Sequence, residues 1–100
     1  YDFGTNVPGI QATEGFKLDQ NYPDPFSTST IISFRLQEAG NVQLAVYDVT
    51  GREVQTLLNE YMQQGDYSVT FNGAELPAGY YMYKITSGSF NKTNSMLHVK

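Results

Sequence analysis

The sequence of 100 residues contains no cysteine, no tryptophan and a single histidine. Without cysteine the chain cannot form a disulfide framework, a catalytic thiolate or a cysteine-ligated zinc site. One histidine is too few for a zinc site built on histidines, or for an iron site with two histidines and a carboxylate. A Ser-His-Asp triad would have to use His98. We expect His98 instead to be an exposed strand residue, on the face opposite Leu97 and Val99.

Other signatures of chemistry are missing as well. The chain has no GxxxxGK[ST] phosphate loop, no GxGxxG fingerprint and no DxDxDG-type loop, which leaves only scattered turn carboxylates as conceivable calcium ligands. The isoelectric point near 4.6 argues against nucleic acid. No apolar run approaches the ~18 residues of a membrane-spanning helix. The sequence therefore predicts a non-catalytic domain with no cofactor, no metal, no nucleic-acid partner and no small-molecule substrate.

The acidic residues are unevenly placed along the chain. Residues 1–75 hold all ten acidic residues and three basic ones, whereas residues 76–100 hold three lysines and no acid. The lysines of this last quarter are Lys84, Lys92 and Lys100. Either their placement is accidental on solvated faces, or the last strand carries a positive charge that a partner recognises.

The N-terminal residues 1–15 show no periodicity and contain Gly4, Pro8, Gly9 and Gly15. This pattern predicts a flexible linker, with ordered structure beginning near Phe16. The chain opens at Tyr1 with no initiator methionine, so we expect a piece of a larger polypeptide whose upstream part is a cargo domain.

From residue 16 onward the sequence alternates apolar and polar residues in short runs, which predicts strands with one buried face. The inward rows that we predict are Ile32, Phe34 and Leu36; Val42, Leu44 and Val46; Val54, Thr56 and Leu58; Tyr67, Val69 and Phe71; and Tyr81, Tyr83 and Ile85. A final strand runs through Met96, Leu97 and Val99. About seven strands spaced about 8–12 residues apart predict an all-β, antiparallel, immunoglobulin-like or fibronectin III-like β-sandwich without a disulfide.

The turns between these runs also carry signals. We expect positive φ at Gly40-Asn41, a left-handed Gly51, and a tight hairpin at residues 87–89. Residues 59–65 predict a longer connection with one loose helical turn.

One segment, residues 20–26, is unlike the rest because Pro23 and Pro25 stand one residue apart. Two prolines so close restrict the backbone and remove two hydrogen-bond donors. We therefore expect a stiff, extended lead-in whose aromatic residues, Tyr22 and Phe26, dock on a sheet edge.

Four segments, in this order, resemble a known family. They are QNYPDPF at residues 20–26, VYDVTGREV at residues 46–54, LPAGYY at residues 76–81 and MLHVK at residues 96–100. The family is the C-terminal sorting domain (type A) of the type IX secretion system of Bacteroidetes and relatives, also described as the Por secretion system C-terminal target domain. The resemblance covers residues 16–100. Asp24 stands where asparagine is usual, and Ser95 where a basic residue is frequent. The positions that match the family's structural motifs are Asn21, Pro23, Pro25, Phe26, Tyr47, Asp48, Gly51, Arg52, Gly79 and Tyr81.

The resemblance implies a secretion label fused behind a cargo protein. Such a label crosses the periplasm with its cargo and then engages the type IX outer-membrane translocon and its shuttle. A sortase-like surface peptidase commonly removes it, and the cargo is anchored at the cell surface or released. The residues that we expect the translocon or shuttle to recognise are Lys92, Met96, Leu97, His98, Val99 and Lys100.

Two mechanistic expectations follow from this reading. The last strand could offer backbone groups along a sheet edge, together with Lys100 and the free carboxylate. Cleavage is expected in or just before residues 1–15. Two alternatives remain open: a carbohydrate-binding or adhesive module that uses outward Tyr47, Tyr61 and Tyr80, and a structural spacer of a secreted protein.

Overall fold

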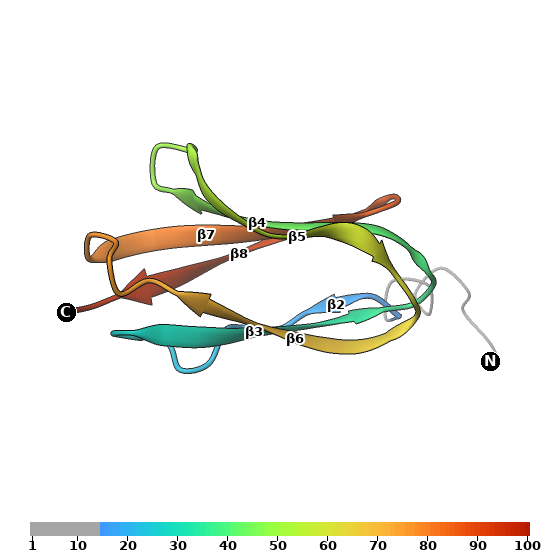
Figure 1. Ribbon diagram of the computed structural model, residues 1–100, viewed down its shortest axis with the longest axis horizontal. Coiled ribbons are helices and arrows are strands. Elements are labelled where there is room, and N and C mark those ends of the chain that lie inside the picture. The colour runs from blue at the N-terminus through green and yellow to red at the C-terminus, as the bar shows by residue number, and fades with distance from the viewer. Residues whose placement is uncertain (1–14) are drawn as a thin grey trace, which may run out of the picture.

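The computed structural model describes residues 15–100, which form two antiparallel β-sheets packed face to face (Figure 1). The strands are β2 (Lys17–Leu18), β3 (Ser29–Leu36), β4 (Gly40–Asp48), β5 (Glu53–Met62), β6 (Gly65–Asn72), β7 (Gly79–Ser87) and β8 (Phe90–His98). Their order is β2-β3-β6 in one sheet and β5-β4-β7-β8 in the other. The predicted all-β sandwich of about seven strands is confirmed. Residues 15–100 include no helix that could cross a membrane.

The predicted linker, residues 1–15, lies outside the described residues apart from Gly15. Its boundary with the folded domain therefore stays a prediction.

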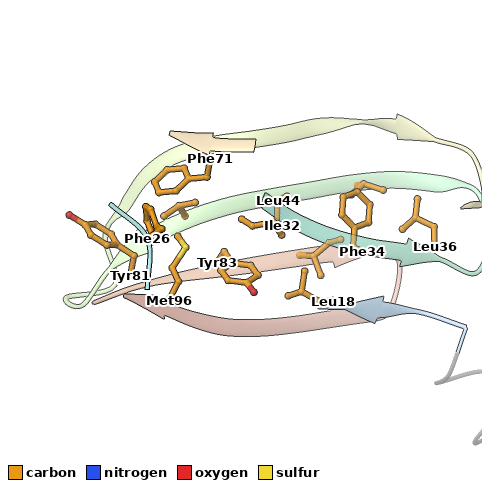
Figure 2. Close-up of a cluster of buried hydrophobic side chains, with 13 residues drawn as sticks. Leu18, Phe26, Ile32, Phe34, Leu36, Leu44, Phe71, Tyr81, Tyr83 and Met96 are labelled. Carbon is orange, nitrogen blue, oxygen red and sulfur yellow. The ribbon is translucent and has the colours of Figure 1, made fainter. Parts of the chain in front are cut away.

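The core lies between the two sheets and is built mainly from the inward rows predicted for β3, β4, β6 and β7. Ile32, Leu44, Phe71, Tyr83 and Ile85 are completely buried. Figure 2 shows the core as one continuous row of side chains, with Phe26, Phe71, Tyr81 and Met96 at one end and Phe34 and Leu36 at the other. Alternating side chains on two facing sheets can interdigitate in this way without any disulfide.

The row predicted for β5 (Val54, Thr56 and Leu58) is wrong at Thr56, which is exposed, whereas Leu57 packs on the core. The reason is the register shift opposite Leu44 and Ala45, which breaks the alternation of β5 at this point.

Two predictions about the connections are wrong. The stretch expected to hold a helical turn is strand, because β5 continues to Met62 and pairs with β4 as far as Gly40. Only residues 63–64 separate β5 from β6 in the opposite sheet. Gly40 does not have positive φ and is the first residue of β4. By contrast, Gly51 and Gly88 have φ of 89° and 59°, as predicted for the turns that contain them.

The order of the larger sheet places β5 and β8 at its two edges. β8 pairs with β7 along its whole length, from Ser87↔Phe90 to Gly79↔His98. The last strand therefore lies at a sheet edge, as the sequence predicts.

Adjacent isoleucines on β3 give a matched test of the core. Ile32 is 0% exposed, whereas the side chain of Ile31 faces outward and the residue is 47% exposed. Ile32→Ala should lower the free energy of unfolding by about 2–5 kcal/mol, because it leaves a cavity between the sheets. Ile31→Ala should cost less than about 1 kcal/mol. Urea denaturation of the two variants measures the difference, and equal losses would contradict the predicted facing of β3.

Candidate functional site

Residues 20–26, which we call the proline segment, connect the two sheets beside β8. Tyr22 forms an isolated bridge with Ile31 of β3, and Phe26 forms one with His98 of β8. Between these bridges the chain bends, and both X-Pro bonds are cis. Because the chain bends at residues 23–25, the expected extended lead-in is wrong. Phe26 docks at the sheet edge as predicted and is 1% exposed. Tyr22 pairs with Ile31 through its backbone, but its side chain does not pack on the sheet, since the residue is 79% exposed.

A buried polar network fixes the first half of this segment. The side chain of Asn21, 2% exposed, donates to the Thr30 hydroxyl at 3.0 Å and to the Pro23 carbonyl at 3.2 Å. The Thr30 hydroxyl in turn donates to the Pro23 carbonyl at 2.8 Å. The backbone N–H of Asn21 donates to the hydroxyl of Tyr83 at 2.8 Å. Because Thr30 lies on β3 and Tyr83 on β7, this one asparagine joins the proline segment to both sheets.

The Tyr83 hydroxyl is the centre of the network on the β7 side. It donates to the Asp19 carbonyl at 2.7 Å, and the Asn94 side chain lies 3.3 Å from it. Burial raises the pKa of Tyr83, and the hydrogen bonds from Asn94 and Asn21 oppose that rise. The phenol therefore stays protonated and remains a donor at neutral pH.

Phe26 fixes the second half of the proline segment against the end of β8. Its ring stacks on that of His98, with centroids 4.9 Å apart and planes 11° from parallel, and meets Phe71 edge-on at 6.0 Å. The Nε2 of His98 lies 2.6 Å from the Gly73 carbonyl and therefore donates to it. A Cβ on Gly73 would come within 3.1 Å of the Phe26 ring, so a larger residue would need the ring to shift by a few tenths of an ångström, which glycine avoids.

The expectation that His98 is an exposed strand residue is wrong, because it is 3% exposed. The reason is its register with β7. Met96 pairs with the inward-facing Tyr81, and His98 is two residues further on the same face. Leu97 and Val99 therefore have the opposite, outward phase. Leu97 is half-buried, while Val99 and Lys100 are exposed.

The outer edge of β8 is not open along this stretch. Phe26 N–H donates to the Leu97 carbonyl at 3.0 Å, and Val99 N–H donates to the Phe26 carbonyl at 2.8 Å. Gln20 and Asp24 add side-chain hydrogen bonds to Ser95 and Leu97. The expected free edge is therefore occupied by the proline segment from Ser95 to Val99.

The second family motif, residues 46–54, is a turn organised by Asp48. One carboxylate oxygen accepts hydrogen bonds from the Thr50 hydroxyl at 2.6 Å, the Thr50 N–H at 3.0 Å and the Arg52 N–H at 3.1 Å. The other lies 3.4 Å from the Arg52 guanidinium. The Thr50 hydroxyl is the main cause that lowers the pKa of Asp48, helped by the two backbone bonds and the charge of Arg52. Gly51 supplies the left-handed residue that closes this turn.

The third motif lies next to the end of β8. Gly79 has φ of 145° and pairs with His98 across the sheet. Tyr81 donates its hydroxyl to the Pro77 carbonyl at 2.6 Å, and its ring centroid lies 6.4 Å from that of His98. Three of the four motifs thus meet at one end of the sandwich, around the last residues of β8.

The residues predicted for recognition divide between two faces of β8. Met96 and His98 are buried and hold the strand on the core, whereas Leu97 and Val99 face outward. Lys100 is exposed and lies beyond the end of β8. Lys92 is exposed and pairs with Ile85, further from the end of the strand. Among residues 15–100 no group of three His, Asp or Glu side chains is placed to hold a metal ion.

Sequence reasoning missed several residues that build this site. Thr30 is a hydroxyl residue in the inward phase of an otherwise apolar row, and such a position signals a buried polar partner. The role of Tyr83 had no such signal, since a buried tyrosine also fits a purely apolar core. The contribution of Gly73 depends on a close approach between segments far apart in the sequence.

Comparison with protein-family models gives a match over residues 20–100 to the family described as secretion system C-terminal sorting domain. The match begins at the first residue of the proline segment and covers all the strands except β2. Comparison with curated proteins gives no match.

Removing one hydroxyl tests the polar network. Tyr83→Phe should lower the free energy of unfolding by about 1–3 kcal/mol, because it leaves the buried N–H of Asn21 without its acceptor. Tyr80→Phe, at a tyrosine that is 61% exposed, should be close to neutral. Chemical denaturation of both variants provides the measurement, and a neutral Tyr83→Phe would show that the network does not hold the proline segment.

The Asp48 turn should make stability depend on pH. Because the folded-state pKa of Asp48 is lowered, its ionised form stabilises the fold above its unfolded pKa, and this contribution is lost as pH falls through the folded pKa. Melting temperature should therefore drop below about pH 4. Asp48→Asn should reduce that drop and lower the melting temperature at pH 7. An unchanged acid slope in Asp48→Asn would contradict the role of the carboxylate; thermal melts from pH 7 to pH 3 supply the data.

Proposed function

Because the chain belongs to the secretion system C-terminal sorting domain family, we propose that its sandwich displays the end of β8 as the mark by which the type IX export machinery selects its cargo. The domain is a C-terminal sorting signal of type IX secretion, which carries proteins across the outer membrane to the cell surface or the extracellular space. The observation that supports the role of β8 is that two other family motifs, residues 20–26 and 76–81, converge on its last residues, which form a motif themselves.

The surface that we propose for recognition is the outward side of this strand end. It consists of Leu97 and Val99, with Tyr80 beside them, since Tyr80 pairs with Leu97 and is 61% exposed. The exposed Lys100 follows directly beyond the end of the strand. Met96 and His98 act indirectly, because their burial fixes the outward direction of their neighbours. An apolar surface of this kind, rimmed by a positive charge, is typical of a protein-binding site.

Charge favours a partner with acidic groups near its apolar contact. Residues 76–100, which form β7 and β8, contain three lysines and no acid. Lys84 is half-buried, while Lys92 and Lys100 are exposed. Although these lysines do not share one face, their net positive charge would speed association with an acidic receptor and disfavour basic surfaces, in a manner that depends on salt.

The finer steps of export are part of the same proposal. The domain follows its cargo, engages the outer-membrane translocon and its shuttle, and performs no catalysis itself. A sortase-like surface peptidase then cuts in or just before residues 1–15, and the cargo is anchored or released. Support for these steps comes from the family membership, since residues 1–14 lie outside the described structure.

The alternative of a sugar-binding module has less support. Of the three tyrosines expected to face outward, Tyr47 is half-buried. Tyr61 and Tyr80 are both 61% exposed, but they lie at opposite ends of the larger sheet. Tyr61 pairs with Asn41 near the start of β4. Tyr80 is next to Tyr81 on β7, and Tyr81 pairs with Asp48 at the end of β4. Tyrosines so far apart do not form a single stacking platform.

Export of a fused reporter in a type IX-competent host tests the proposal. Leu97→Asp should reduce export of a fluorescent protein fused to residues 1–100 by about tenfold or more, because it places a charge in the apolar contact. Tyr61→Asp introduces the same charge at an exposed aromatic residue on β5 and should leave export unchanged. Melting curves of both variants verify folding. Export of a folded Leu97→Asp variant at the normal level would refute the proposed surface.

A further inference from the structure

The outer edge of β8 is satisfied from within the chain, although the strand lies at the edge of its sheet. Gln20 Nε2 donates to the Ser95 carbonyl at 2.7 Å, and Leu97 N–H donates to Asp24 Oδ1 at 3.1 Å. Phe26 then pairs through its backbone with the Leu97 carbonyl and the Val99 N–H. These are the groups that a neighbouring strand would otherwise bind.

The proline segment thus imitates a strand without being one. The Gln20 amide replaces a backbone N–H, the Asp24 carboxylate replaces a backbone carbonyl, and Phe26 supplies one of each. Nearer the start of β8, the backbone N–H and carbonyl groups of Asn91 and Thr93 point to the same outer edge. No hydrogen bond among the described residues reaches these groups. Coverage is therefore confined to the half of β8 that carries the proposed recognition surface.

Exposure separates two tasks within the proline segment. Asn21 and Phe26 are 2% and 1% exposed and anchor the segment in the polar network and the core. Gln20 and Asp24 are exposed, and the Gln20 amide also reaches Asp24 Oδ2 at 3.2 Å. Their substitution should therefore loosen the end of β8 while leaving the anchors in place.

We propose that Gln20 and Asp24 are positioning residues of the sorting signal. Through the backbone of Ser95 and Leu97 they hold the strand end extended, with Leu97 and Val99 facing outward. By occupying the edge they also prevent a receptor strand from pairing there. The export receptor therefore docks on the outward side chains and does not extend the sheet. This inference rests on the proposed recognition surface at the end of β8.

Variants of Asp24 in the full chain, fused to the same reporter, test this inference. Asp24→Leu keeps the branched shape of the side chain but removes the acceptor, so hydrogen exchange at the Leu97 amide should accelerate about tenfold or more. Export should fall by a similar factor, whereas the melting temperature should change little because Asn21 and Phe26 remain. Asp24→Asn keeps an oxygen acceptor and should restore both slow exchange and export.

A control separates positioning from loss of stability. Arg35 and Asp66 form an exposed ion pair in the β2-β3-β6 sheet, which does not contain β8. Arg35→Ala breaks this pair and should leave export and Leu97 exchange unchanged. Normal or increased export of Asp24→Leu, with faster exchange at Leu97, would overturn the proposal, and increased export would indicate that the receptor replaces the proline segment. Unchanged exchange at Leu97 would also overturn it.

The variant Leu97→Asp distinguishes the two levels of the argument. If Leu97→Asp is exported normally, the recognition surface itself is wrong. If it is not exported but Asp24→Leu is, the surface holds and only the positioning role fails.

Discussion

The structure depends on one buried asparagine that bonds to both sheets at once. Asn21 reaches Thr30 on β3 through its side chain and Tyr83 on β7 through its backbone N–H. A buried polar group is costly unless it is satisfied, so this network tolerates few alternative arrangements of the proline segment. The apolar core alone would hold two sheets together, but it would not fix the position of the proline segment. The hydrogen-bond network around Asn21 fixes that position.

The position of Phe26 follows from this constraint. Once Asn21 is fixed, the short chain between the two residues brings Phe26 to the end of β8, where its ring fills the space beside His98 and Phe71. Gly73 allows this approach, and its carbonyl accepts the His98 hydrogen bond. A single histidine that suggested no catalytic chemistry thus serves as a packing and hydrogen-bonding residue. The segment that it binds is also the one that covers the edge of its own strand.

The sequence predicted those features that depend on local alternation, such as the inward rows of β3, β4, β6 and β7 and the turn at Gly51. It failed where the outcome depends on pairing with a distant strand. Met96, Leu97 and Val99 are all apolar, and only the pairing of Met96 with Tyr81 shows that His98 is inside and Leu97 outside. Likewise, the polar residues at the end of β5 suggested a loop, yet their pairing with β4 keeps them in a strand whose register shifts twice. The family resemblance indicated which segments matter, but not that the proline segment covers the edge of β8.

The alternation of inward and outward side chains along β8 links the stability of the fold to the proposed recognition of the strand end by a receptor. The same strand turns Met96 and His98 into the core and Leu97 and Val99 outward, so the strand end cannot be presented unless the sandwich is folded. An unfolded chain would contain the same residues, but without a common outward face and without the covered edge. A receptor that binds this face would therefore distinguish a folded sorting domain from an unfolded one. Coverage of the edge adds a second benefit, because an uncovered strand end invites pairing with other chains. Placing the family motifs around the strand end thus serves both presentation and protection.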